Sequence, residues 1–281
     1  MNTTKIFAIS CINKSGEWDI KVFIDSQWWL HQFKKPKLEN DCDIRNETDL
    51  LVQLNYALER NQDKKIIFAT HHPLFSAGIH GGHFPLSQNI FPLTSINKNL
   101  YIPLPGFIYT AYRKYLGGIQ DLSHPEYKEM RKMLTGVFKD FPDLIYASGH
   151  EQNMQYAKKS GIHHIISGAA GEVKYVAKNN RSDFAAQNRG FSRINFYADG
   201  DVWLEFFVPN DAGTESELIY RRFLYNKPRK IQEENIEIKN RPDYSDSTVF
   251  LHPSDQYHAG KTKKFWMGEN KKCNHKVALY I

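Results

Sequence analysis

One stretch decides the fold: Lys64-Lys65-Ile66-Ile67-Phe68-Ala69-Thr70-His71-His72-Pro73-Leu74. Its short apolar run is typical of a strand buried on both faces, and the run leads directly into histidines and a proline. A second stretch repeats the pattern: Asp143-Leu144-Ile145-Tyr146-Ala147-Ser148-Gly149-His150-Glu151-Gln152. Ligands of open α/β sheets bind just outside the carboxyl ends of the strands. Two strands that end in histidine can therefore aim two imidazoles, those of His71 and His150, at one metal ion.

The flanking segments alternate between predicted helices and strands, as in α/β proteins. Upstream, residues 5–12 and 20–24 predict a β-hairpin, and a helix is predicted from Asn46 to about Asn61. Downstream, Ser123 and Glu126 are spaced as a capping box before a helix with one apolar stripe, and Pro142 ends that helix. Residues 162–166 predict a third strand, on which the His163-His164 pair alternates, so that only one of the two points inward.

Residues 74–122 carry ten glycines and prolines without a strong period, yet many aromatics, so we expect an ordered lid with a helical segment near 106–116. Residues 191–196 and 202–208 predict a hairpin, and residues 218–225 predict one more strand. The composition turns polar and charged after Pro228. We therefore expect one α/β domain over residues 1–226, and a polar tail or linker over 227–281 that leads to the start of a further module.

The composition excludes several classes of function. The chain has 281 residues and a net charge of +6 without a clustered basic face, so we expect no nucleic-acid partner. Three dispersed cysteines form neither a disulfide framework nor a zinc finger. No apolar run is long enough to span a membrane as a helix, and residues 1–9 are too short and polar for a secretory signal.

The two histidine segments resemble a known family. Phe68-Ala69-Thr70-His71-His72-Pro73-Leu74-Phe75-Ser76 is similar to the valine-x-x-histidine segment of the calcineurin-like metallophosphoesterases, which include the purple acid phosphatases. Ser148-Gly149-His150-Glu151-Gln152-Asn153-Met154-Gln155-Tyr156 resembles their glycine-histidine-x-histidine segment. Residues 76–83 resemble a loop that some members place over the site. The match covers about residues 23–208.

The resemblance implies a fold, a reaction and a set of site residues. The fold would be the C-terminal half of a four-layer α/β/β/α sandwich with mixed sheets, and the reaction a metal-dependent hydrolysis of a phosphoester. Two divalent ions (zinc, manganese or iron) would activate a water for attack on phosphorus. His71 and His150 would bind one of them, with Gln152 as a weaker ligand, and His80 and His83 would contact the phosphate or act as acid.

Two departures from the family pattern qualify this expectation. The aspartate-x-histidine, glycine-aspartate and glycine-asparagine-histidine motifs of the family do not occur before His71. The second histidine of the glycine-histidine-x-histidine segment is Gln152, whose neutral amide binds transition metals less well than imidazole. We therefore expect the isolated chain to be inactive.

Two alternatives stay open: a non-catalytic binding or scaffold remnant, and a half-domain completed in trans by a separate N-terminal half. Residues 243–270 resemble a segment that leads toward an outer-membrane module in some long bacterial members, so the intact protein could belong to the cell envelope.

Overall fold

The computed structural model describes residues 7–11, 19–31, 44, 46–91, 97, 99, 101, 106–168, 171–178, 181–227 and 273–279. The chain divides into two compact units, Met1–Pro228 with Cys273–Ile281, and Arg229–Lys272. The second unit lies outside the described residues, as do the turn at 13–17 and nearly all of the linker at 34–45. The expected domain boundary after residue 226 stays a prediction.

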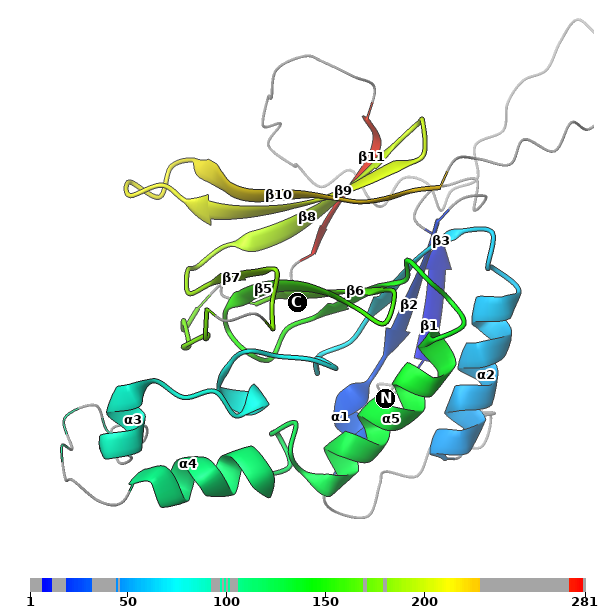
Figure 1. Cartoon of the computed structure of the whole chain (residues 1–281). Helices are drawn as coiled ribbons and strands as arrows, with labels where there is room; N and C mark the ends of the chain where they lie inside the picture. The colour runs from blue at the N-terminus through cyan, green and yellow to red at the C-terminus, as the bar shows by residue number, and fades with distance from the viewer. Residues whose placement is uncertain are drawn as a thin grey trace, which may run out of the picture. The chain divides into compact units, whose positions relative to one another are not determined.

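The first unit is a mixed α/β structure with two sheets, as the sequence predicts (Figure 1). The first sheet has the order β1-β2-β3-β4-β6-β5-β7. Its strands are β1 (Phe7–Cys11), β2 (Asp19–Ile24), β3 (Lys65–Ala69), β4 (Ile145–Ser148), β5 (Met154–Lys159), β6 (Ile162–Ser167) and β7 (Phe184–Ala186). The neighbours β2, β3, β4 and β6 pair in parallel, while β1, β5 and β7 join by antiparallel pairing, so the sheet is mixed.

The second sheet is antiparallel and has the order β10-β9-β8-β11. It contains β8 (Phe191–Tyr197), β9 (Asp201–Pro209), β10 (Ser216–Asn226) and β11 (Cys273–Leu279). The predicted hairpins are confirmed, because β1 pairs with β2 and β8 with β9. The helices of the unit are α1 (Ser26–Trp29), α2 (Glu47–Glu59), η1 (Ile79–Gly81, a 3-10 turn), α3 (Leu86–Ile90), α4 (Gly106–Tyr115) and α5 (Pro125–Phe138).

Alternating side chains of the central strands enter two hydrophobic cores. Phe68 of β3 and Tyr146 of β4 pack with α2 and α5, which cover one face of the first sheet (Figure 1). Ile67 and Ile145 lie in a second core, shared with β8 and β9 of the other sheet. Both faces are thus covered, which explains the unbroken apolar runs. The described residues supply the helical layer and the two sheets; among them, no helix covers the outer face of the second sheet.

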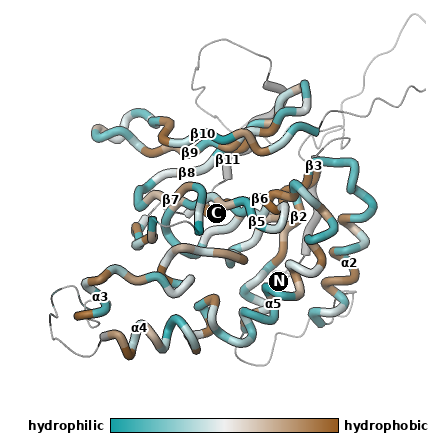
Figure 2. Tube along the Cα trace, in the orientation of Figure 1, coloured by the Kyte–Doolittle hydropathy of each residue, from teal (hydrophilic) through white to brown (hydrophobic). Residues whose placement is uncertain are grey.

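Local sequence explains the two covering helices. The Asn46 side chain accepts a hydrogen bond from the Asp49 amide at 2.9 Å and caps α2, whose buried side chains recur every four residues. Hydrophobic and hydrophilic residues alternate along α2 in Figure 2. In α5, Pro125 occupies the first turn and Tyr127, Met130, Leu134 and Phe138 form the buried stripe. No helix in the described part of the chain is long and apolar enough to cross a membrane.

Two local predictions are wrong. Ser123 does not cap α5: the helix starts after His124 without a side-chain cap, because the Ser123 hydroxyl donates to the Arg113 carbonyl at 2.6 Å. His163 and His164 are both buried, with exposed fractions of 0% and 8%, because β6 lies inside the sheet with both faces covered. In contrast, the helical segment expected near 106–116 is confirmed as α4.

Candidate functional site

The carboxyl ends of β3 and β4 meet at one edge of the first sheet. Beyond the strands, the Thr70 amide donates to the Ala147 carbonyl and the Gly149 amide to the His71 carbonyl, both at 3.1 Å. This extra pairing holds the two chain segments together where each leaves its strand. His71 and His150 therefore lie at the same edge, as strand order and direction require.

The backbone at His150 takes an uncommon conformation. His150 has φ of 67° and Gln152 has φ of 53°, the left-handed region that side chains other than glycine seldom occupy. Such residues persist only where the surroundings hold them, and they gather at functional sites. Here the loop turns back on itself so that the His150 ring faces His71.

The two imidazoles present nitrogens to each other. His150 Nδ1 lies 3.2 Å from His71 Nε2. The opposite nitrogen of His150, Nε2, lies 2.9 Å from the Gln120 carbonyl, which only accepts, so Nε2 carries the proton and Nδ1 has the lone pair. Two imidazole nitrogens bound to one tetrahedral zinc ion, with Zn–N bonds of about 2.0–2.1 Å, lie roughly 3.3 Å from each other. The spacing suits two ligands of one ion.

His72 completes a cluster that the sequence did not predict. The ligand nitrogens of His71, His72 and His150 all lie within 4.8 Å of one another. However, His72 is fully buried and both of its ring nitrogens are engaged: Nδ1 with the Ser26 hydroxyl and Nε2 with the Gln120 side-chain oxygen, each at 2.8 Å. His72 is thus held by the protein, while Gln120 orients both His72 and His150.

His80 lies against the cluster, with its ring centroid 4.3 Å from that of His150. Its Nδ1 donates to Asp121 at 2.9 Å, which leaves Nε2 for a ligand. Asp121 also binds Arg113 and the Gly118 amide. Burial alone would raise the pKa of Asp121, but the hydrogen bonds from His80 and Arg113 outweigh it and hold that pKa at about 2. The carboxylate is therefore charged at every pH of interest and fixes the ring of His80.

The structure does not bring the other two predicted residues into the cluster. His83 follows the η1 turn in the chain, and its Nε2 lies 3.3 Å from the Arg181 guanidinium. Among the described residues, no hydrogen bond joins Gln152 to the histidines. Its side-chain oxygen is buried without a hydrogen-bond partner among them, and its backbone carbonyl accepts from Lys174. The role of Gln152 as a ligand stays a prediction.

The clustered imidazoles are neutral near pH 7. Burial lowers the pKa of His72 to about 4 and that of His150 to about 3, and it also lowers the pKa of His71. The neighbouring His80 adds to the lowering in each case. Neutral imidazoles have the lone pairs that a metal ion needs.

Carboxylates are missing from the described cluster. Asp25 is close enough to raise the pKa of His71, but its carboxylate caps α1 by accepting from the Gln27 and Trp28 amides. Glu151 is fully buried, and burial raises its pKa, so the acid is held toward its neutral form. The described residues therefore fit one divalent ion bound by imidazoles. A second ion, which the family resemblance implies, finds no bridging carboxylate among them.

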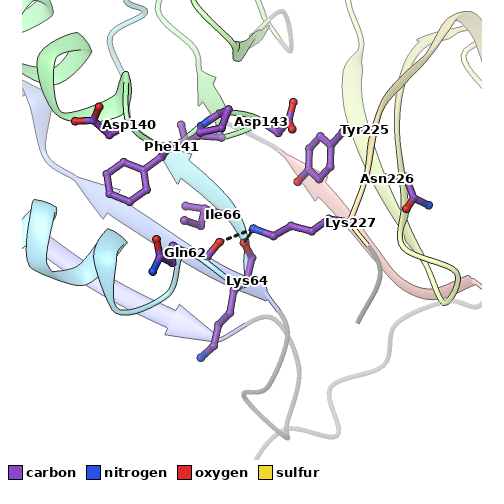
Figure 3. Close-up of a pocket in the computed structure, with 11 residues that line it drawn as sticks. Gln62, Lys64, Ile66, Asp140, Phe141, Asp143, Tyr225, Asn226 and Lys227 are labelled. Atoms are coloured by element: carbon purple, nitrogen blue, oxygen red, sulfur yellow. Dashed lines mark hydrogen bonds between the residues drawn. The ribbon is translucent and has the colours of Figure 1, made fainter. Parts of the chain in front are cut away.

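Two cavities of the described unit are lined by other residues than the histidine cluster. One of about 380 Å³ opens at the amino ends of β3 and β4, the opposite edge of the sheet (Figure 3). Lys64, Lys227, Asp140 and Asp143 are among the residues that line it, and the Lys227 ammonium already donates to the Gln62 and Lys64 carbonyls. Because the lining carries both positive and negative side chains, and the Lys227 ammonium is already hydrogen-bonded, the cavity favours no particular class of ligand. A second cavity adjoins the η1 turn.

Comparison with known proteins gives weak likenesses. No protein-family model matches the chain, and no curated protein matches it. Among solved structures, it is similar to GAP50, the anchor in the inner membrane complex of Plasmodium (TM-score 0.47, 17% identity, 80% of this chain and 55% of that one). It is also similar to purple acid phosphatase PPD1 from seeds of yellow lupin, Lupinus luteus (TM-score 0.41, 11% identity, 73% of this chain and 30% of that one). A third similar structure is that of PhoD (TM-score 0.41, 10% identity, 82% of this chain and 45% of that one).

The chain thus spans about half of GAP50 and less than half of the other two proteins. At such low identity and TM-score, no residue role passes from these proteins to this chain. Function must be inferred from the chain's own residues.

Proposed function

We propose that this chain provides the histidine half of a metal-dependent phosphoester hydrolase site. His71 and His150 bind one divalent ion, and carboxylate ligands from outside the described residues are needed for turnover. The observation that carries the proposal is the 3.2 Å separation of His71 Nε2 and His150 Nδ1, with the far nitrogen of His150 tied to the backbone. A ligand held by a hydrogen bond on its other nitrogen is how proteins orient metal-binding histidines.

The remaining residues have supporting tasks in this proposal. Gln120 and Ser26 hold His72, whose buried ring packs against the rings of His71 and His150. Asp121 holds His80 with Nε2 toward the site, where it can hydrogen-bond a phosphate oxygen. The ion, when bound, would supply Lewis-acid stabilisation of the phosphoryl oxygens.

Metal titration of the purified chain tests the proposal. One equivalent of Zn²⁺ or Mn²⁺ should bind, and inorganic phosphate should bind only to the metal-loaded chain. His150→Ala should weaken metal binding by at least about tenfold, the effect typical of disturbed metal sites. His124→Asn is the matched control, because His124 lies outside the cluster at the start of α5, where asparagine also caps well.

Hydrolysis of an aryl phosphate separates the proposal from its rivals. The isolated chain should show no turnover above background, because no described carboxylate bridges two ions. Turnover that vanishes in His71→Ala would show that the ligand set inferred for this chain is incomplete. Metal binding without any metal-dependent phosphate binding would instead favour a non-catalytic binding module, the second candidate, which the lack of carboxylates in the cluster supports.

A further inference from the structure

A cavity of about 370 Å³ lies between the η1 turn and α4. Its volume falls within the usual range of small-molecule sites. It is lined by Gly82, His83, Phe84, Asn89, Phe107, Thr110, Ala111, Lys114, Tyr115 and Ala177. No residue of the proposed metal cluster is among them, so the cavity is a separate feature of the fold.

The lining combines aromatic rings with positive charge. Phe84, Phe107 and Tyr115 offer ring faces and edges, and Lys114 lies 5.5 Å from the centre of the Tyr115 ring. Arg181 adds its charge through His83. None of the lining residues is acidic, and the whole stretch from 74 to 120 contains no aspartate or glutamate. Such a surface favours an anionic ligand with an aromatic group.

The cavity and the histidine cluster share one turn of chain. His80 is the middle residue of η1, and Gly82, which lines the cavity, ends that turn with φ of 79°. Two residues span at most roughly 7 Å between Cα atoms, so the cavity begins within that distance of the His80 backbone. Gly82 also lets the turn approach α4 closely, because a Cβ at that position would lie 3.2 Å from the Lys114 Cα.

We propose that this cavity receives the aromatic group of a phosphate monoester whose phosphate lies toward His80 and His150. The assignment rests on the proposed function and narrows its substrate class to aryl or nucleoside monophosphates. Lys114 attracts the anion, and the rings of Phe107 and Tyr115 contact its organic group. Aliphatic phosphates of the same charge make no ring contacts there and bind less well.

Calorimetric titration of the full chain with adenosine monophosphate tests the assignment. Adenosine and inorganic phosphate serve as the two halves of that probe, and each should bind more weakly than the whole. Phe107→Ala should weaken binding of the monophosphate about fivefold, the loss expected for one ring contact. Ile108→Ala is the matched control, because the Ile108 side chain is exposed to a similar degree as Phe107 but does not line the cavity. Lys114→Gln should also weaken binding, whereas Lys128→Gln on α5 should not.

The outcomes separate this assignment from the proposed function. In His150→Ala the monophosphate should still bind through its aromatic group, although more weakly because its phosphate loses the metal, and in Phe107→Ala the metal should still bind. Equal affinities for Phe107→Ala and Ile108→Ala, or undetectable binding of the monophosphate, would overturn the cavity assignment and leave the metal site standing. Monophosphate binding without metal binding would overturn the proposed function instead.

Discussion

Gln120 joins two imidazoles of the site to one point of the chain. Its backbone carbonyl accepts from His150, and its side-chain oxygen accepts from His72. Substitution of the Gln120 side chain removes only the contact with His72, because the contact with His150 is made by the backbone. The role of Gln120 in stability can therefore be separated from its role in orienting His150.

Gln120→Ala should lower the free energy of unfolding by about 1–3 kcal/mol, because it leaves a buried ring nitrogen of His72 without its acceptor. Metal stoichiometry should stay at one, since the carbonyl that orients His150 remains. Urea unfolding and metal titration of the same samples check both halves. Gln27→Ala, which removes only the 3.5 Å contact between the two glutamines, should leave stability nearly unchanged.

The sequence could predict the two proposed ligands but not their supports. His71 and His150 follow buried strands, so their meeting edge follows from strand direction alone. His72 contacts Gln120 at a sequence separation of 48 residues. Arg113, near the end of α4, binds Asp121 in the loop that follows that helix. No local pattern encodes contacts between a lid and a strand end, so these residues are found only in the folded structure.

Among the elements, those with a clear hydrophobic period were predictable. α2, α5 and β3 were all predicted because buried side chains repeat at the period of a helix or fill both faces of a strand. β5 and β11 were missed. β5 reads Met-Gln-Tyr-Ala-Lys-Lys, in which buried Gln155 bonds to Ala77 and Ser76 of the lid rather than to water. A buried polar residue with a distant partner hides a strand from pattern analysis.

Gly78 packs the lid against the loop that carries His150. A Cβ at Gly78 would overlap the Glu151 carboxylate and lie 2.8 Å from its Cδ. Gly78→Ala should therefore destabilise the chain by roughly 1–3 kcal/mol and weaken metal binding, because it displaces Glu151 and with it His150. Thermal unfolding and metal titration check the two effects.

Gly136→Ala is the matched control for that substitution. Gly136 lies inside α5, and an added Cβ meets nothing within 4 Å. Alanine should stabilise the helix there by about 0.5–1 kcal/mol. If both substitutions changed stability in the same direction, the close packing inferred at Gly78 would be wrong.

Lys227 ties the end of β10 to the turn between α2 and β3. Its ammonium donates to the Gln62 and Lys64 carbonyls at 2.7 and 2.6 Å (Figure 3). Lys227→Met should lower the free energy of unfolding by about 1–2 kcal/mol. This is less than two charge-assisted hydrogen bonds would contribute in a buried site, because the Lys227 site is open to solvent. Lys158→Met, which removes only an exposed ion pair with Asp143, should cost less in the same urea titration.

The whole unit is built around two sheets that share a core, and buried polar groups lie on both faces of the first sheet. His163 contacts Tyr156 and Tyr225 between the sheets, and His164 contacts Tyr146 on the other face. Burial lowers the pKa of His163 and of His164 to about 4 in each case. These imidazoles can take up a proton only when the packing around them opens, so their titration reports on the entire fold.

Acid should therefore unfold the chain at a mild pH. In the unfolded chain a histidine binds its proton near pH 6.5, whereas His163 and His164 resist it until about pH 4. The unfolded state binds more protons in this window, so stability is complete above pH 6.5 and falls as the pH drops toward 4. His72 and His150 act in the same direction, and Glu151, whose pKa is raised by burial, opposes them as a single group. Each fully buried histidine accounts for a loss of up to roughly 3 kcal/mol in the free energy of unfolding as the pH falls from 6.5 to 4.

Urea unfolding at several pH values between 7.5 and 4.5 measures this loss. His164→Gln should reduce the slope of stability against pH, because it removes one of the protonation sites while keeping a polar side chain of similar size. The variant is expected to be less stable than the natural chain at pH 7.5 and closer to it at pH 4.5. Parallel curves for the two proteins would show that His164 is not protonated on unfolding in this range, and that burial does not hold its imidazole neutral.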